Sequence, residues 1–270
     1  MKTRAITGFF FIIVMIASNL LGHYVFGAFY LLLSCLCLWE FYGLIHQSGL
    51  KPNWITGLLN GAIIFTIFAL ITYDNNAGNQ RLLFLLPITM SAIFIQELFK
   101  KTEAPFTNVA YTYLGLIFTI MPFTFFHALA YVTGTFNFHF PLGFLLMLWA
   151  NDTGAYLVGS QLGKTKLFER HSPKKTWEGF IGGILITAGA AVIISNYYTE
   201  LNWQQWVWIG VLISTFGTTG DLIESMFKRS INVKDSGGIL PGHGGLLDRF
   251  DGLLMAAPIV YAYLYFITNA

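Results

Sequence analysis

The chain has 270 residues, of which 55% are hydrophobic and 17% aromatic, and its formal net charge is +2. Only 10% of the residues are charged, against roughly 25% in soluble domains. A soluble globular protein is therefore excluded, because it would have to expose too much apolar surface, and the small net charge gives no reason to expect a nucleic-acid partner.

The hydropathy pattern predicts an all-α, polytopic integral membrane protein. Apolar windows of about 17–25 residues are the signature of membrane-spanning helices. Nine such windows occur, at about residues 5–21, 24–45, 54–73, 82–99, 108–132, 140–160, 179–197, 203–220 and 250–268. Lys2 and Arg4 precede the first window, but no cleavage site of small residues follows it, so we expect an uncleaved helix.

Two regions with different roles are expected. Residues 1–135 contain helices joined by short loops and are predicted to be a scaffold. Residues 136–270 contain the remaining helices and two long polar loops, at about 161–178 and 221–249, and are predicted to be the catalytic region.

The basic residues predict how the helices are oriented. If the N-terminus and every second loop share one side of the membrane, that side holds every lysine and arginine except Arg81. Basic residues accumulate on the cytoplasmic side of membrane proteins. We therefore expect the chain in the cell (inner) membrane, with its N-terminus and both polar loops cytoplasmic and its C-terminus outside.

Glu40 is a carboxylate inside the second apolar window. Placing a charged group there costs roughly 2.5–3.5 kcal/mol on insertion scales. Glu40 is therefore expected to be protonated, to be hydrogen-bonded to a neighbouring helix, or to have a functional role.

The first polar segment surrounds the end of the sixth window, where Asp152 lies. The sequence GSQLGKT at 159–165 has a glycine spacing one residue too short for a phosphate-binding P-loop, and no strand precedes it. In the following SPKKTWEG, Ser172 can cap a turn, while Lys174 and Lys175 lie beside an expected helix N-terminus. This combination favours an anion site, and the alternative is a cationic anchor for the seventh helix.

The second polar segment favours metal and phosphate chemistry. Asp248 and Asp251 are three residues apart and share a helix face, and Asp221 ends the eighth window on the same side of the membrane. Oxygen ligands of this kind suit Mg²⁺, whereas the segment contains one histidine and no cysteine, which disfavours zinc.

Basic residues and glycines lie between these carboxylates. The basic residues are Lys228, Arg229, Lys234 and Arg249, and the glycines lie within residues 237–245. Glycine lets backbone N–H groups approach a phosphate, and basic side chains neutralise its charge. An ordinary solvated loop rarely combines all these features.

The order of residues in this segment resembles the signature of the phosphatidate cytidylyltransferase (CDP-diacylglycerol synthase) family. The matching residues are Ser225, Lys228, Arg229, Lys234, Asp235, His243, Gly244, Gly245, Asp248, Arg249 and Asp251. The upstream SPKKTWEG is similar to a second block of that family. The resemblance extends over the whole chain, although the first half contributes little beyond hydropathy.

The resemblance implies that CTP and phosphatidate are converted to CDP-diacylglycerol and pyrophosphate, with Mg²⁺ required. It is also compatible with a second cation and with a homodimer. Metal binding is assigned to Asp221, Asp248 and Asp251, and Lys234, Asp235 and His243 are expected at the catalytic site. The expected substrate contacts are Asp152, Ser172, Lys174, Lys175, Ser225, Lys228, Arg229 and Arg249.

Four alternative functions share some of these features. A CTP-dependent polyprenol kinase or an archaeal-type CDP-lipid synthase would also use CTP at a membrane. A proton-coupled transporter could use Glu40 and Asp152 as relays, but it would not explain the carboxylates, cations and glycines gathered in one loop. The aspartate pattern of CDP-alcohol phosphotransferases is missing from the sequence.

Overall fold

The computed structural model describes residues 2–73, 77–233, 237 and 244–268. Its helices in the first half are α1 (Lys2–Leu20), α2 (His23–Gln47), α3 (Trp54–Tyr73), α4 (Ala77–Gln80), the 3-10 helix η1 (Arg81–Phe84), α5 (Leu85–Leu98), α6 (Pro105–Gly115), the π-helical turn η2 (Leu116–Ile120) and α7 (Met121–Leu129). The second half contains α8 (His139–Leu162), β1 (Lys166–Phe168), β2 (Ser172–Thr176), α9 (Trp177–Ser195), α10 (Trp203–Ser230) and α11 (Leu247–Thr268).

The predicted all-α membrane fold is confirmed. Each of the nine apolar windows corresponds to one helical segment, because α4, η1 and α5 follow one another directly, as do α6, η2 and α7. In the described part of the chain, seven segments are long and apolar enough to cross a membrane; α1, with a shorter apolar stretch, and α8 are not among them.

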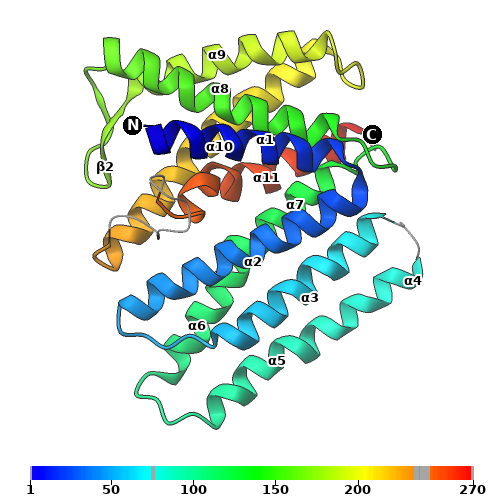
Figure 1. The fold of residues 1–270 in the computed structure, drawn as a ribbon, viewed down its shortest axis with the longest axis vertical. Coiled ribbons are helices and arrows are strands. Elements are labelled where there is room, and N and C mark those ends of the chain that lie inside the picture. Colours follow the sequence, from blue (N-terminus) through cyan, green and yellow to red (C-terminus); the bar gives the residue numbers. More distant parts are fainter. Residues whose placement is uncertain (1, 74–76, 234–236, 238–243, 269–270) are drawn as a thin grey trace.

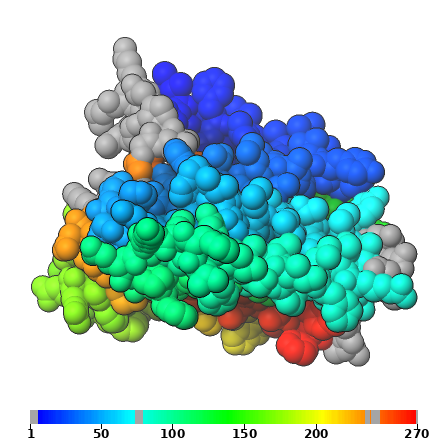
Figure 2. Space-filling view, turned by 90° about the horizontal axis from the view of Figure 1, so that it is seen from below, coloured from blue at the N-terminus to red at the C-terminus, as the bar shows by residue number. Residues whose placement is uncertain are grey.

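The helices form a layered bundle (Figure 1). α8 and α9 lie side by side along one edge, α3 and α5 lie along the opposite edge, and α10 and α11 lie between them. Figure 2 shows the face that α3, α5 and α6 cover. The β-hairpin and the C-terminal ends of α2 and α10 lie at one end of the molecule, whereas α4 and the end of α11 lie at the other.

Aromatic side chains hold the two halves of the chain together. Phe123 and Phe126 of α7 are fully buried. The Phe123 ring lies 5.4 Å from that of Phe250 on α11, and the Phe126 ring lies 5.4 Å from that of Phe144 on α8. Tilted and edge-to-face ring pairs at this separation are favourable, so α7 of the first half fixes the positions of two helices from the second half.

The segment from Ser172 to Thr176 differs from its prediction. It is a strand that pairs antiparallel with β1, so Ser172, Lys174 and Lys175 lie on extended backbone ahead of the N-terminus of α9. Pro173 explains the difference, because the residue before a proline is restricted to extended backbone. α9 begins one residue after Thr176, whose side-chain oxygen accepts a hydrogen bond from the Gly179 N–H at 3.2 Å.

Candidate active site

The site begins at the crossing of α10 and α11. A Cβ atom at Gly220 would overlap the carbonyl oxygen of Asp251, and a Cβ at Gly217 would lie 3.9 Å from the Cα of Gly252. Glycines at such a crossing let two helix backbones approach closely. The crossing therefore brings the position after Gly220, which is Asp221, beside Asp251.

α8 fits into the same crossing. The Leu148 side chain is buried and fills the notch that Gly217 and Gly252 leave, since a Cβ at either glycine would lie only about 3 Å from its Cδ1 atom. Asp152 follows Leu148 by four residues and so lies one helical turn further along α8. A third helix thereby contributes a carboxylate to the site.

A cavity of about 450 Å³ contains all of these carboxylates. Asp152, Asp221, Asp248 and Asp251 line it together with Arg249. Its remaining wall is formed by Gly217, Trp149 and four residues of α1, which are Thr7, Gly8, Phe11 and Ile12. The three residues predicted to bind metal thus share one cavity, as a common ion would require.

Lys175 links the β-hairpin to this cavity. Its Nζ atom lies 2.6 Å from Oδ2 of Asp221. The carboxyl groups of Asp152, Asp221 and Asp251 also interact electrostatically with one another and with this lysine. A cation among them offsets the repulsion of like charges, so the hairpin supplies charge that α8, α10 and α11 need.

A second lysine holds the beginning of α11. The Nζ atom of Lys228 lies 2.7 Å from Glu224 Oε2 and 2.6 Å from Asp248 Oδ1. The Gly245 N–H donates to the other oxygen of Asp248 at 3.3 Å. The Glu224 side chain is 1% exposed, and those of Lys228 and Asp248 are 12% and 13% exposed. This buried charge triad fixes α11 against α10.

Several other predicted residues do not line the cavity. The Ser225 hydroxyl donates to Asp221 Oδ1 at 3.3 Å, whereas exposed Arg229 donates to the carbonyl oxygen of Val233 at 3.3 Å. Lys174 is exposed on β2. Three predicted site residues fall outside the described part of the chain: Lys234, Asp235 and His243.

The carboxylates are not arranged as a ready-made metal site. Across residues 2–73, 77–233, 237 and 244–268, no three acidic, histidine or cysteine side chains are grouped so that they could hold a metal ion. The ion pairs explain this arrangement, because Asp221 and Asp248 each face a lysine ammonium group.

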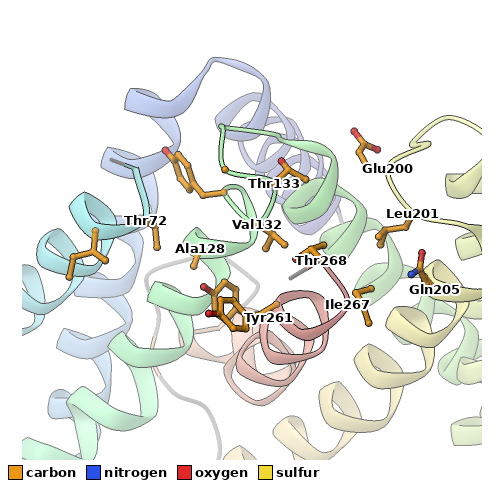
Figure 3. A pocket seen from close by; sticks show the side chains of 14 residues that line it. Thr72, Ala128, Val132, Thr133, Glu200, Leu201, Gln205, Tyr261, Ile267 and Thr268 are labelled. Atoms are coloured by element: carbon orange, nitrogen blue, oxygen red, sulfur yellow. The ribbon is translucent and has the colours of Figure 1, made fainter. Parts of the chain in front are cut away.

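A larger cavity, of about 700 Å³, lies where loop residues 132–134 and 200–201 meet the ends of α3 and α11. Figure 3 shows Glu200, Gln205 and Tyr261 among its lining residues. Asn137 and His139 hold the Glu200 carboxylate. None of the predicted site residues that the structure describes lines this cavity, so its size does not make it the candidate active site.

Comparison with known proteins identifies the family. Residues 2–267 match the model of the cytidylyltransferase family. A phosphatidate cytidylyltransferase from Staphylococcus aureus strain COL is 35% identical over 265 residues, which cover 96% of this chain and 97% of that protein. Proteins of the same name from Staphylococcus haemolyticus and Staphylococcus saprophyticus are 33% and 34% identical, each with 96% of this chain and 97% of the relative covered. This chain belongs to the cytidylyltransferase family.

The sequence alone did not show that two further carboxylates of this cytidylyltransferase, Glu224 and Glu40, hold helices of the site in place. Glu224 pairs with Lys228, and the signal that could have found it is their four-residue spacing, which is that of an ion pair on one helix face. Glu40 accepts a hydrogen bond from the Leu247 N–H of α11, with its Oε2 atom 2.7 Å from the nitrogen. The expectation of a bond to a neighbouring helix is thus confirmed, but its partner is 207 residues away.

Proposed function

We propose that this cytidylyltransferase transfers the cytidylyl group of CTP to phosphatidate. The observation that carries the proposal is the single cavity in which four aspartates from three helices meet, with Lys175 and Lys228 bonded to two of them. The names of the staphylococcal relatives support the same activity. Carboxylates and cations gathered in one cavity are the groups that phosphoryl chemistry uses.

The reaction itself requires little from the protein beyond placement and neutralisation of charge. An oxygen of the lipid phosphate attacks the α-phosphorus of CTP, and a new P–O bond forms while the bond to the bridging oxygen breaks. Pyrophosphate leaves with the bonding electron pair. The attacking phosphate is already an anion, so no side chain has to remove a proton from it.

Mg²⁺ is the cofactor that the donor set suits. Asp221, Asp248 and Asp251 offer only carboxylate oxygens, and Asp152 adds another from α8; hard cations such as Mg²⁺ prefer these ligands. Bound there, the ion would neutralise charge on the transferring phosphate. A second cation stays an expectation from the family resemblance.

The basic residues are the proposed phosphate contacts. Lys175 and Lys228 already lie 2.6 Å from cavity aspartates, and Arg249 lines the cavity. Lys174 and Arg229 are exposed nearby and are placed to attract anionic substrates. Ammonium and guanidinium groups at these positions would hold the CTP phosphates and the lipid headgroup.

The lipid is proposed to approach along α1. Phe11 and Ile12 of α1 and Trp149 of α8 supply the apolar lining of the cavity that also contains the aspartates. Acyl chains can follow such a wall while the headgroup reaches the carboxylates. The end of the molecule that carries the β-hairpin would face the cytoplasm, as the distribution of basic residues indicates. A homodimer stays an expectation from the family resemblance.

Two forms of CTP, labelled at different phosphorus atoms, test the proposal. Purified protein in detergent is incubated with phosphatidate, graded Mg²⁺ and CTP labelled at either the α- or the γ-phosphorus. We expect the α-label in the lipid product, the γ-label in pyrophosphate, and no turnover without Mg²⁺. Transfer of the γ-label to a polyprenol would instead identify a kinase, and exclusive use of an isoprenoid ether-lipid phosphate would identify an archaeal-type synthase.

A further inference from the structure

Glu40 of α2 contacts the catalytic half of the chain from the scaffold half. Its side chain is buried, with the residue 5% exposed. Its Oε2 atom accepts the hydrogen bond from the Leu247 N–H, the first residue of α11. The first N–H groups of a helix have no partner within the helix, and a carboxylate at that end also interacts favourably with the helix dipole.

The second oxygen of Glu40 faces Gly237, which precedes α11 in the chain. A Cβ atom at Gly237 would overlap Oε1 of Glu40, so the backbone at this position rests directly on the carboxylate. Only glycine permits an approach this close. One side chain of α2 therefore contacts both residue 237 of the loop and the start of the next helix.

The anchored helix end carries the groups on which the chemistry depends. Leu247 is fully buried, Asp248 follows it directly, and Asp251 lies one turn further. At the same helix end, Asp248 is bonded to Lys228 and to the Gly245 N–H, and the Phe250 ring packs on Phe123. A shift of Leu247 would consequently move two cavity aspartates together.

We propose that Glu40 is a positioning residue for the cytidylyl-transfer site, holding Gly237 and the first turn of α11 so that Asp248 and Asp251 face Asp221. This role rests on the proposed function, since it concerns the same cavity. Glu40 itself touches no substrate. It determines where the aspartates stand, and it explains why a carboxylate is kept within an apolar helix despite its cost.

The test combines kinetics with amide hydrogen exchange on the purified, full-length protein. Glu40→Ala removes both contacts, Glu40→Asp keeps the charge but is too short to reach, and Glu40→Gln keeps an acceptor for the Leu247 N–H. Glu97→Ala is the matched control, because Glu97 is another buried scaffold glutamate with hydrogen bonds from Asn53, Thr102 and Asn108.

We expect Glu40→Ala and Glu40→Asp to lower kcat by roughly 10- to 100-fold, the effect of a displacement of about 1 Å in a catalytic constellation, with a smaller change in KM for CTP. Glu40→Gln should recover much of kcat. Exchange of the amides at 244–250 should accelerate in Glu40→Ala but not in Glu97→Ala.

Two results would overturn the proposal: unchanged exchange at 244–250 in Glu40→Ala, or kinetic parameters of Glu40→Ala equal to those of Glu97→Ala. Failure of the proposed function gives a different result. The wild-type protein would then label no phosphatidate, while the exchange experiment would still report whether Glu40 anchors α11.

Discussion

Replacing Lys228 by methionine should destabilise the protein strongly. Lys228 lies 2.7 Å from Glu224 and 2.6 Å from Asp248, and all three side chains are largely buried. Each pair has a Coulomb attraction of about 6 kcal/mol at an effective dielectric constant of about 20. Desolvation of the three ions offsets much of that attraction.

Removing the lysine is expected to lower the free energy of unfolding by more than the intact triad contributes to it. Two buried carboxylates would be left without the lysine, and breaking such a pair costs about 3–5 kcal/mol. With about 2 °C of melting temperature per kcal/mol in a protein of this size, the melting temperature should fall by at least about 6 °C. Tryptophan fluorescence during heating in detergent measures this directly, since the chain contains seven tryptophans.

Two control variants separate this mechanism from a general loss of charge. Lys101→Met removes an exposed lysine and should leave the melting temperature nearly unchanged. Combining Lys228→Met with Glu224→Gln and Asp248→Asn removes the stranded charges and should restore most of the loss. A fall of less than about 2 °C in Lys228→Met, or no recovery in the triple variant, would refute the reasoning.

Three further predictions concern the aspartates, the helix crossing and the opposite end of the molecule. Asp251→Asn should abolish cytidylyl transfer while the melting temperature stays near that of the wild type; a wild-type rate would remove this residue from the metal site. Gly220→Ala should lower both activity and melting temperature, because its Cβ would overlap the Asp251 carbonyl oxygen. Gly189→Ala is the control: with open space around it, the added methyl group should stabilise its helix by up to about 1 kcal/mol. Equal effects of the two substitutions would contradict the close crossing of α10 and α11. Partial burial disfavours the ionised Glu200, but the hydrogen bond from Asn137 and the other polar contacts of the carboxylate outweigh this and lower its pKa below the ordinary value for glutamate.

The lowered pKa of Glu200 makes the stability of the protein depend on pH. A carboxylate with a depressed folded-state pKa contributes stability above its unfolded pKa, and this contribution is lost as the pH falls through the folded value. The wild-type melting temperature should therefore decrease more steeply below about pH 4.5 than that of Glu200→Gln. Parallel pH profiles of the two proteins would show that the contacts of Glu200 add no stability.

Local features of the chain were predictable because they depend on neighbours in the sequence. Apolar windows located all nine helical segments, and the three-residue spacing of Asp248 and Asp251 placed both at the start of one helix, as α11 shows. The end of α10 was less accessible to prediction. The helix continues to Ser230, beyond the end of the apolar window, because its last turns carry charged residues that a hydropathy window excludes. Lys228 and Glu224 pair with each other there, so the charged residues are compatible with a buried helix end.

The sequence by itself determined the class of fold, the family and the set of acidic and basic residues at issue. Only the tertiary structure decided which of them meet: Asp152 of α8 beside Asp221, Lys175 of a β-hairpin on Asp221, and Glu40 on an amide 207 residues away. Hydropathy and helical periodicity report the environment and face of a residue. They carry no information on which helix packs against that face, and here the glycines at one crossing and the packing of Leu148 decide it.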